Sequence, residues 1–205
     1  MLPRNRHSPW LRIAFMLGAI GLFLFGYQWG NQYKSKHAQP PIISGVLVRP
    51  PAAIPGFRLL DPRGRVFDQD TLAAGWTLLA FGDLSGAQGQ LAIQRLIDVY
   101  NRIGGDADLQ RALRLVLVTT TDAPNLARDF SRLSPALYIL AGDAGETGRL
   151  RAALGTGEDA DPPLFVFAPG GYLIALLTND EDGSAMAADL EALYANAHVL
   201  LPESP

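Results

Sequence analysis

Few residues of this 205-residue chain combine a reactive type with a spacing that could support chemistry. The chain has no cysteine, so it has no thiolate to act as a nucleophile, a redox group or a soft metal ligand. Its three histidines, His7, His37 and His198, lie far apart near the two ends of the sequence. Met186 stands alone on a predicted helix, a pattern typical of packing. We therefore expect no metal centre and no cofactor.

Ser85 is the best-placed candidate nucleophile because it comes just before a predicted helix. The residues around it lack the Gly-x-Ser-x-Gly pattern of a hydrolase, and the nearest candidate base, His198, is in the C-terminal tail. Ser85 and Gln88 instead have the spacing of a capping box. The surrounding GDLSGAQGQ is rich in glycine but lacks the lysine of a phosphate-binding loop. We expect the protein not to be an enzyme.

The elements that position Ser85 are a strand, a tight turn and a helix. Residues 76–81 form an apolar run, residues 82–86 have turn chemistry, and residues 91–103 carry apolar side chains at helical spacing. Elsewhere the pattern predicts strands at residues 57–60, 65–67, 113–121, 136–140, 164–167 and 172–177, and helices at residues 122–133, 146–154 and 184–195. This alternation predicts an α/β fold, a thioredoxin-like sandwich with a central mixed sheet flanked by helices.

Phe81 and Gly82 begin a motif that resembles the Sco/SenC family of membrane-anchored, thioredoxin-like copper chaperones for cytochrome c oxidase. In that family a strand is followed by Phe-Gly-Tyr-Thr-x-Cys-Pro-x-x-Cys and a helix, and the similarity covers about residues 46–194. Counted along the motif, Gly86 and Gln90 stand where the two cysteines would be. Alignment of FVFAPGG with the family's closing hairpin puts Ala160 where the histidine ligand would be. The resemblance implies a divergent member without copper ligands.

The N-terminal segment is predicted to span a membrane. Residues 13–29 are apolar except for Gln28, and Trp10 and Trp29 flank them as interfacial aromatic residues do. A helix of about 18 residues reaches about 27 Å, enough to cross the hydrocarbon core. Three arginines precede the span and two lysines follow it, which favours a cytoplasmic N-terminus. A cleaved signal peptide is the alternative.

Charge and composition suggest the remaining organisation. From residue 39 onward the chain has 12 arginines, no lysine and 20 acidic residues, a net charge of −8 that argues against nucleic acid as a partner. We predict a single-pass protein of the bacterial inner (cytoplasmic) membrane with a periplasmic domain. The predicted parts are a cytoplasmic N-terminus (1–12), a transmembrane helix (13–30), a proline-rich juxtamembrane spacer (31–55), a thioredoxin-like domain (56–197) and a C-terminal tail (198–205).

Two functions from different classes remain open. The first, implied by the resemblance, is a non-catalytic interaction module in the assembly or support of a respiratory haem-copper oxidase, with its subunits or assembly factors as partners. The second is a small-ligand or anion-binding domain, or a residual enzyme, at the vacant helix N-terminus. The family places its site where two loops converge, here residues 83–90 and 158–163. The candidate interaction residues are Asp83, Leu84, Ser85, Gly86, Gln88, Gln90, Ala160, Pro162 and Pro163. Thioredoxin-like folds also lead us to predict a cis Pro162–Pro163 bond.

Overall fold

The computed structural model describes residues 40–120, 124–132, 134–157 and 162–202, together with Ile20 and Leu22. The chain divides into two units, Met1–Pro40 and Pro41–Pro205. The predicted membrane span at residues 13–30 lies outside the described residues except for Ile20 and Leu22. Among the residues described, no helix has both the length and the apolar character needed to cross a membrane.

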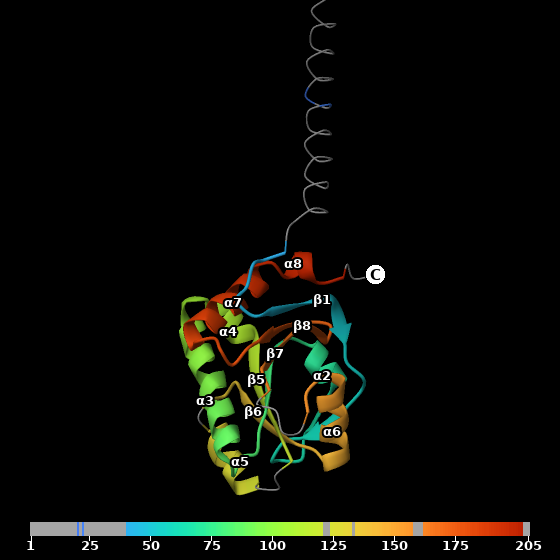
Figure 1. Ribbon diagram of the computed structural model, residues 1–205, viewed down its shortest axis with the longest axis vertical. Helices are drawn as coiled ribbons and strands as arrows, with labels where there is room; N and C mark the ends of the chain where they lie inside the picture. The colour runs from blue at the N-terminus through green and yellow to red at the C-terminus, as the bar shows by residue number, and fades with distance from the viewer. Residues whose placement is uncertain are drawn as a thin grey trace, which may run out of the picture. The chain divides into compact units, whose positions relative to one another are not determined.

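The second unit is built on one mixed sheet, to which the described residues contribute eight strands. The strands are β1 (Val46–Ala53), β2 (Arg58–Leu60), β3 (Val66–Asp68), β4 (Trp76–Phe81), β5 (Leu113–Thr119), β6 (Leu137–Ala141), β7 (Leu164–Ala168) and β8 (Tyr172–Leu177). Their order across the sheet is β1-β8-β7-β4-β5-β6-β2-β3 (Figure 1). The central trio β4, β5 and β6 is parallel, and the outer pairings are antiparallel.

Helices cover both faces of this sheet. They are α2 (Gln69–Ala73), α3 (Ala87–Arg102), the 3-10 turn η1 (Ile103–Gly105), α4 (Ala107–Ala112), α5 (Pro124–Ser131), α6 (Ala144–Ala153), α7 (Gly183–Ala195) and α8 (Ala197–Leu200). Figure 1 shows α3, α5 and α7 on one face and α2 and α6 on the other. Two apolar clusters, one on each face, form the core. This architecture confirms the predicted thioredoxin-like α/β sandwich.

The central strand β4 shows why the buried strands of the sheet could be predicted from the sequence. All six of its residues are buried, as are the last five of β5, because helices cover both faces of the sheet here. Strands in such a position read as continuous apolar runs. The predicted strand at residues 76–81 is confirmed with the same bounds. The predicted strand at residues 113–121 is confirmed as far as Thr119, and residue 121 lies outside the described residues.

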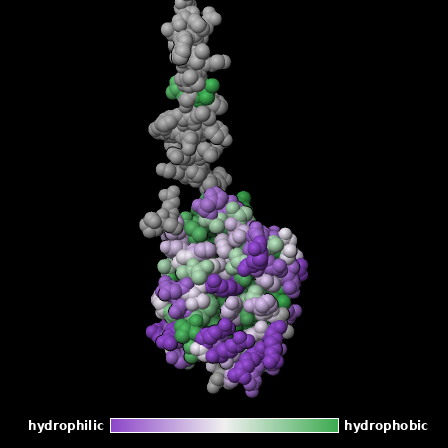
Figure 2. Space-filling view, turned by 180° about the vertical axis from the view of Figure 1, so that it is seen from behind, coloured by the Kyte–Doolittle hydropathy of each residue, from purple (hydrophilic) through white to green (hydrophobic). Residues whose placement is uncertain are grey.

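The edge strand β1 lies within the segment that was predicted to be a proline-rich juxtamembrane spacer (31–55). It runs for eight residues and pairs antiparallel with β8. The compact unit therefore begins before residue 56, the predicted start of the domain. In Figure 2, the surface of this unit carries small groups of hydrophobic residues among hydrophilic ones, an ordinary distribution for a folded domain.

Two local predictions differ from the structure. Helix α3 begins at Ala87, ahead of the apolar spacing at residues 91–103, and its N-cap is Gly86, one residue after the Ser85 that the capping-box spacing indicated. The cis peptide bond found within the described residues is Arg49–Pro50, so the prediction of a cis Pro162–Pro163 bond was wrong.

Candidate functional site

The candidate site is the junction between β4 and α3, which two glycines shape. A Cβ atom on Gly89 would lie 2.0 Å from the carbonyl oxygen of Asp83, and one on Gly82 would lie 2.6 Å from the Cα of Gly89. Real side chains do not tolerate such contacts with backbone, so only glycine lets the loop lie directly against the first turn of α3. The junction is therefore a closely packed turn with a fixed shape.

Asp83 holds Ser85 within this turn. The backbone N–H and the hydroxyl of Ser85 both donate to Oδ1 of Asp83, at 2.9 and 2.8 Å. The N-cap of α3 is Gly86, which provides no side-chain hydrogen bond. The predicted capping box of Ser85 with Gln88 was therefore wrong, because the local turn that Asp83 builds takes the hydroxyl away from the helix.

Leu84 occupies a place in the core that the sequence did not suggest. Its side chain is fully buried in the cluster beneath α3, so it is not available to a partner. The residue acts instead as an anchor that fixes the loop to the core. Of the other predicted interaction residues in this loop, Asp83, Ser85, Gln88 and Gln90 are exposed, and Gly86 is half-buried.

Gly86 and Gln90 lie one helical turn apart at the start of α3. The backbone N–H of Gln90 donates to the carbonyl oxygen of Gly86 at 3.3 Å. Position 86 has no side chain, and position 90 offers an amide where a copper(I) ion prefers sulfur. No group of three or more His, Cys, Asp or Glu side chains in the described ranges is arranged to hold a metal ion. The residues present at the junction do not fit a copper ion.

The second predicted loop is described only at its end, since Ala160 lies outside the described residues. Pro162 and Pro163 are half-buried and lead directly into β7. The antiparallel register pairs Leu79 of β4 with Phe165 of β7, which brings Phe81 level with Pro163. The two prolines therefore lie near the carboxyl end of β4, where the junction loop begins. This position agrees with the expected convergence of the loops at residues 83–90 and 158–163.

A residue that the sequence did not single out, Arg151 of α6, reaches the end of β4 from the other face of the sheet. Its guanidinium lies 4.7 Å from the centre of the Phe81 ring, and Nη1 donates to the carbonyl oxygen of Gly157 at 3.2 Å. The Phe81 ring meets Phe165 edge-on at 5.9 Å. Seventy residues separate Arg151 from Phe81, so no local pattern could have joined them. The cation–π contact links α6 to the strand end from which the junction starts.

Comparisons with known proteins find likeness in structure alone. No family model matches the sequence, and no curated protein matches it. The solved structure of apo Sco1 from Thermus thermophilus superposes with a TM-score of 0.60 at 18% identity, over 76% of this chain and 99% of that one. Copper-bound ScoI from Arabidopsis thaliana gives a TM-score of 0.59 at 15% identity, over 70% and 99%.

A third structure, BsSco, is described as a member of the Sco family of cytochrome c oxidase assembly proteins. It gives a TM-score of 0.56 at 11% identity, over 78% of this chain and 99% of that one. The chain has the fold of the Sco proteins. This confirms the fold that the motif around Phe81 implied. The chain has no cysteine, and the resemblance at Phe81 and Gly82 implies that Gly86 and Gln90 stand where the family has its two cysteines.

Proposed function

We propose that this protein is a non-catalytic, Sco-like interaction module that takes part in the assembly or support of a respiratory haem-copper oxidase. The observation that carries the proposal is the combination of a Sco fold with a junction whose shape is fixed and whose ligand positions hold Gly86 and Gln90. Gly82 and Gly89 let the loop pack directly against α3, so its exposed residues are presented on a closely packed turn. A junction that keeps this shape but lacks metal ligands is better suited to recognise a partner protein than to transfer a metal ion.

The partner surface in this proposal comprises the exposed residues of the junction loop with the prolines before β7. Asp83, Ser85, Gln88 and Gln90 are exposed, and loops held on a rigid scaffold are the usual place for recognition. The buried Leu84 and the tightly packed Gly89 hold that loop in place beneath the surface. The surface is polar and small, so we expect it to be one part of a larger contact.

The proposal includes a single membrane span at residues 13–30, with the N-terminus in the cytoplasm and the folded unit in the periplasm. It rests on the apolar length of the segment and on the arginines that precede it. A reporter enzyme that is active only in the periplasm, fused after residue 205, should be active, and the chain should stay with membranes after alkaline extraction. An inactive periplasmic fusion would contradict this orientation.

Removal of the gene from its host tests the function. We expect the amount of assembled haem-copper oxidase in the membranes to fall, and the native gene to restore it. The double variant Gln88→Lys with Gln90→Lys should restore less, because it adds two positive charges to the proposed surface. Glu191→Lys on α7 changes the net charge by the same amount away from the junction and should restore fully. An unchanged oxidase level after removal of the gene would contradict the proposal.

A further inference from the structure

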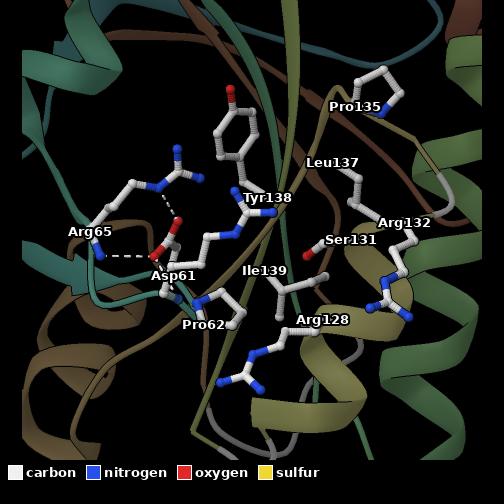
Figure 3. A pocket seen from close by; sticks show the side chains of 11 residues that line it. Asp61, Pro62, Arg65, Arg128, Ser131, Arg132, Pro135, Leu137, Tyr138 and Ile139 are labelled. Atoms are coloured by element: carbon white, nitrogen blue, oxygen red, sulfur yellow. Dashed lines mark hydrogen bonds and ion pairs between the residues drawn. The ribbon is translucent and has the colours of Figure 1, made fainter.

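A pocket of about 340 Å³ lies away from the β4–α3 junction, between the β2–β3 turn, α5 and the start of β6. Figure 3 shows Asp61 and Arg65 of the β2–β3 turn on one side, and Arg128 and Ser131 of α5 with Arg132 just after that helix on the other. We refer to it as the arginine pocket. Its lining residues are Asp61, Pro62, Arg63, Arg65, Arg128, Ser131, Arg132, Pro135, Leu137, Tyr138 and Ile139.

The pocket concentrates positive charge in a domain that is otherwise acidic. Four of the 12 arginines that follow residue 39 line it, although the net charge of that part of the chain is −8. Arg63 and Arg65 come from the turn, Arg128 lies in the last turn of α5, and Arg132 directly follows the end of that helix. Two segments more than 60 residues apart in the sequence thus bring like charges together. All four arginines are exposed, so water and counterions screen their mutual repulsion, and an anion bound in the pocket would lower it further.

Two carboxylates offset part of this charge. Asp61 accepts hydrogen bonds from the backbone N–H of Arg63 at 2.9 Å, the backbone N–H of Arg65 at 2.8 Å and Nε of Arg65 at 2.6 Å. Burial by itself would raise the pKa of Asp61, but these hydrogen bonds outweigh it and the pKa is lowered, so the group is ionised at neutral pH. Asp129 pairs with Arg132 at 3.4 Å.

Arg63 and Arg128 keep their charge uncompensated. Within the described ranges, no carboxylate lies within ion-pair distance of either guanidinium. Two carboxylates against four guanidinium groups leave two positive charges, which equals the charge of about −1.5 to −2 that a phosphate monoester carries at pH 7. The terminal oxygens of a phosphate point in tetrahedral directions and offer more acceptor sites than the two oxygens of a planar carboxylate, so a phosphate suits guanidinium groups that approach from several sides.

We propose that the arginine pocket binds a phosphate group. Arg63 and Arg128 contribute the charge that holds it, and Arg65 and Arg132 enclose it. The pocket is larger than a phosphate, and Pro62, Pro135, Leu137 and Ile139 give it apolar walls that suit the body of a phosphorylated molecule. The phosphate could belong to a soluble compound or to a lipid headgroup, and the experiment below separates the two sources.

The test uses the full chain in non-ionic detergent, with binding of inorganic pyrophosphate followed by titration calorimetry. Arg63→Gln with Arg128→Gln should weaken binding at least about tenfold, because each loses a charge-assisted hydrogen bond. Arg111→Gln with Arg149→Gln removes the same charge from exposed sites outside the pocket and should leave affinity within about twofold. Melting curves establish that both double variants are folded.

Lipid vesicles then show whether the bound phosphate belongs to a lipid headgroup or to a soluble compound. Competition with pyrophosphate by phosphatidylglycerol vesicles, and not by phosphatidylcholine vesicles, indicates a lipid headgroup, and absence of competition indicates a soluble compound. The proposal is overturned if pyrophosphate up to about 10 mM shows no saturable binding, or if both double variants weaken binding equally. Tighter binding of a hexaglutamate peptide than of pyrophosphate overturns it as well, in favour of an acidic protein segment.

Discussion

Gly45 and Asp189, which are 144 residues apart in the sequence, are joined by a hydrogen bond of 2.8 Å from the glycine N–H to Oδ2 of the carboxylate. The second oxygen, Oδ1, accepts the N–H of Ser44 at 3.0 Å. Asp189 lies on α7 and is only 5% exposed. A buried carboxylate thus satisfies two backbone amides and fixes the entry to β1 against the last long helix.

Asp189→Ala should lower the free energy of unfolding by about 1–3 kcal/mol, because the half-buried amide of Gly45 loses its acceptor and the more exposed amide of Ser44 has to turn to water. Denaturant unfolding measures the loss, and hydrogen exchange should show faster exchange in β1 than in β4. Asp189→Asn keeps one acceptor oxygen and should lose less. A cost below about 1 kcal/mol for Asp189→Ala would mean that water replaces the carboxylate readily.

Gly89→Ala should destabilise the protein by about 1–3 kcal/mol, since the new methyl group would force Asp83 and the loop away from α3. Gly148→Ala is the matched control, because Gly148 is also within a helix and its Cβ would meet nothing within 4 Å. The control should gain about 0.5–1 kcal/mol from helix propensity. Equal effects at the two positions would show that the loop adapts and that its shape is not fixed.

Gly86→Cys with Gln90→Cys should create copper(I) affinity in the full chain. The two positions lie one helical turn apart, so both thiolates can reach one ion. Competition with a copper(I) chelator should show affinity at least about a hundredfold above that of the native chain, which offers no soft ligand at the junction. The corresponding double serine variant should gain none. Sub-micromolar affinity in the native chain would contradict our account of the junction.

The N-cap of α7, Asp182, should contribute to the loss of folding stability at low pH. The backbone N–H groups of Ala185 and Ser184 donate to its carboxylate and hold its pKa below the ordinary value of 3.8. A carboxyl whose pKa is lowered by folding stabilises the protein above its unfolded-state pKa, and that stabilisation is lost as the pH falls through the folded-state pKa.

Melting temperatures measured between about pH 6 and pH 2.5 check this. The native chain should lose stability below about pH 4, and Asp182→Asn should lose less over the same interval. Asparagine remains a good N-cap, so the variant should stay folded at neutral pH. If the melting temperatures of the native chain and of Asp182→Asn fall in parallel with pH, Asp182 makes no contribution to the loss of stability in acid.

The sequence was sufficient for the parts of the fold that depend on local pattern. The strands β4, β7 and β8 were predicted because strands buried on both faces are continuous apolar runs that can be recognised within a few residues. The resemblance at Phe81 and Gly82 then indicated the type of fold. Both the central strand and the Sco-like topology follow from such signals.

The details of the site depended on tertiary contacts. The role of Ser85 was mistaken because Asp83 competes with the helix for its hydroxyl, and the burial of Leu84 depends on how α3 lies over the loop. The arginine pocket forms because pairing of Leu60 with Ala141 brings the β2–β3 turn to β6 and α5. No spacing in the sequence encodes these contacts.

The most direct test of the central claim is affinity capture of the tagged full chain from membranes of its host solubilised in mild detergent, followed by identification of the bound chains. We predict recovery of subunits or assembly factors of a haem-copper oxidase. Recovery should fall with Gln88→Lys and Gln90→Lys and persist with Glu191→Lys. Capture of no oxidase-related chain by the native protein, under conditions in which the oxidase itself stays intact, would contradict the account.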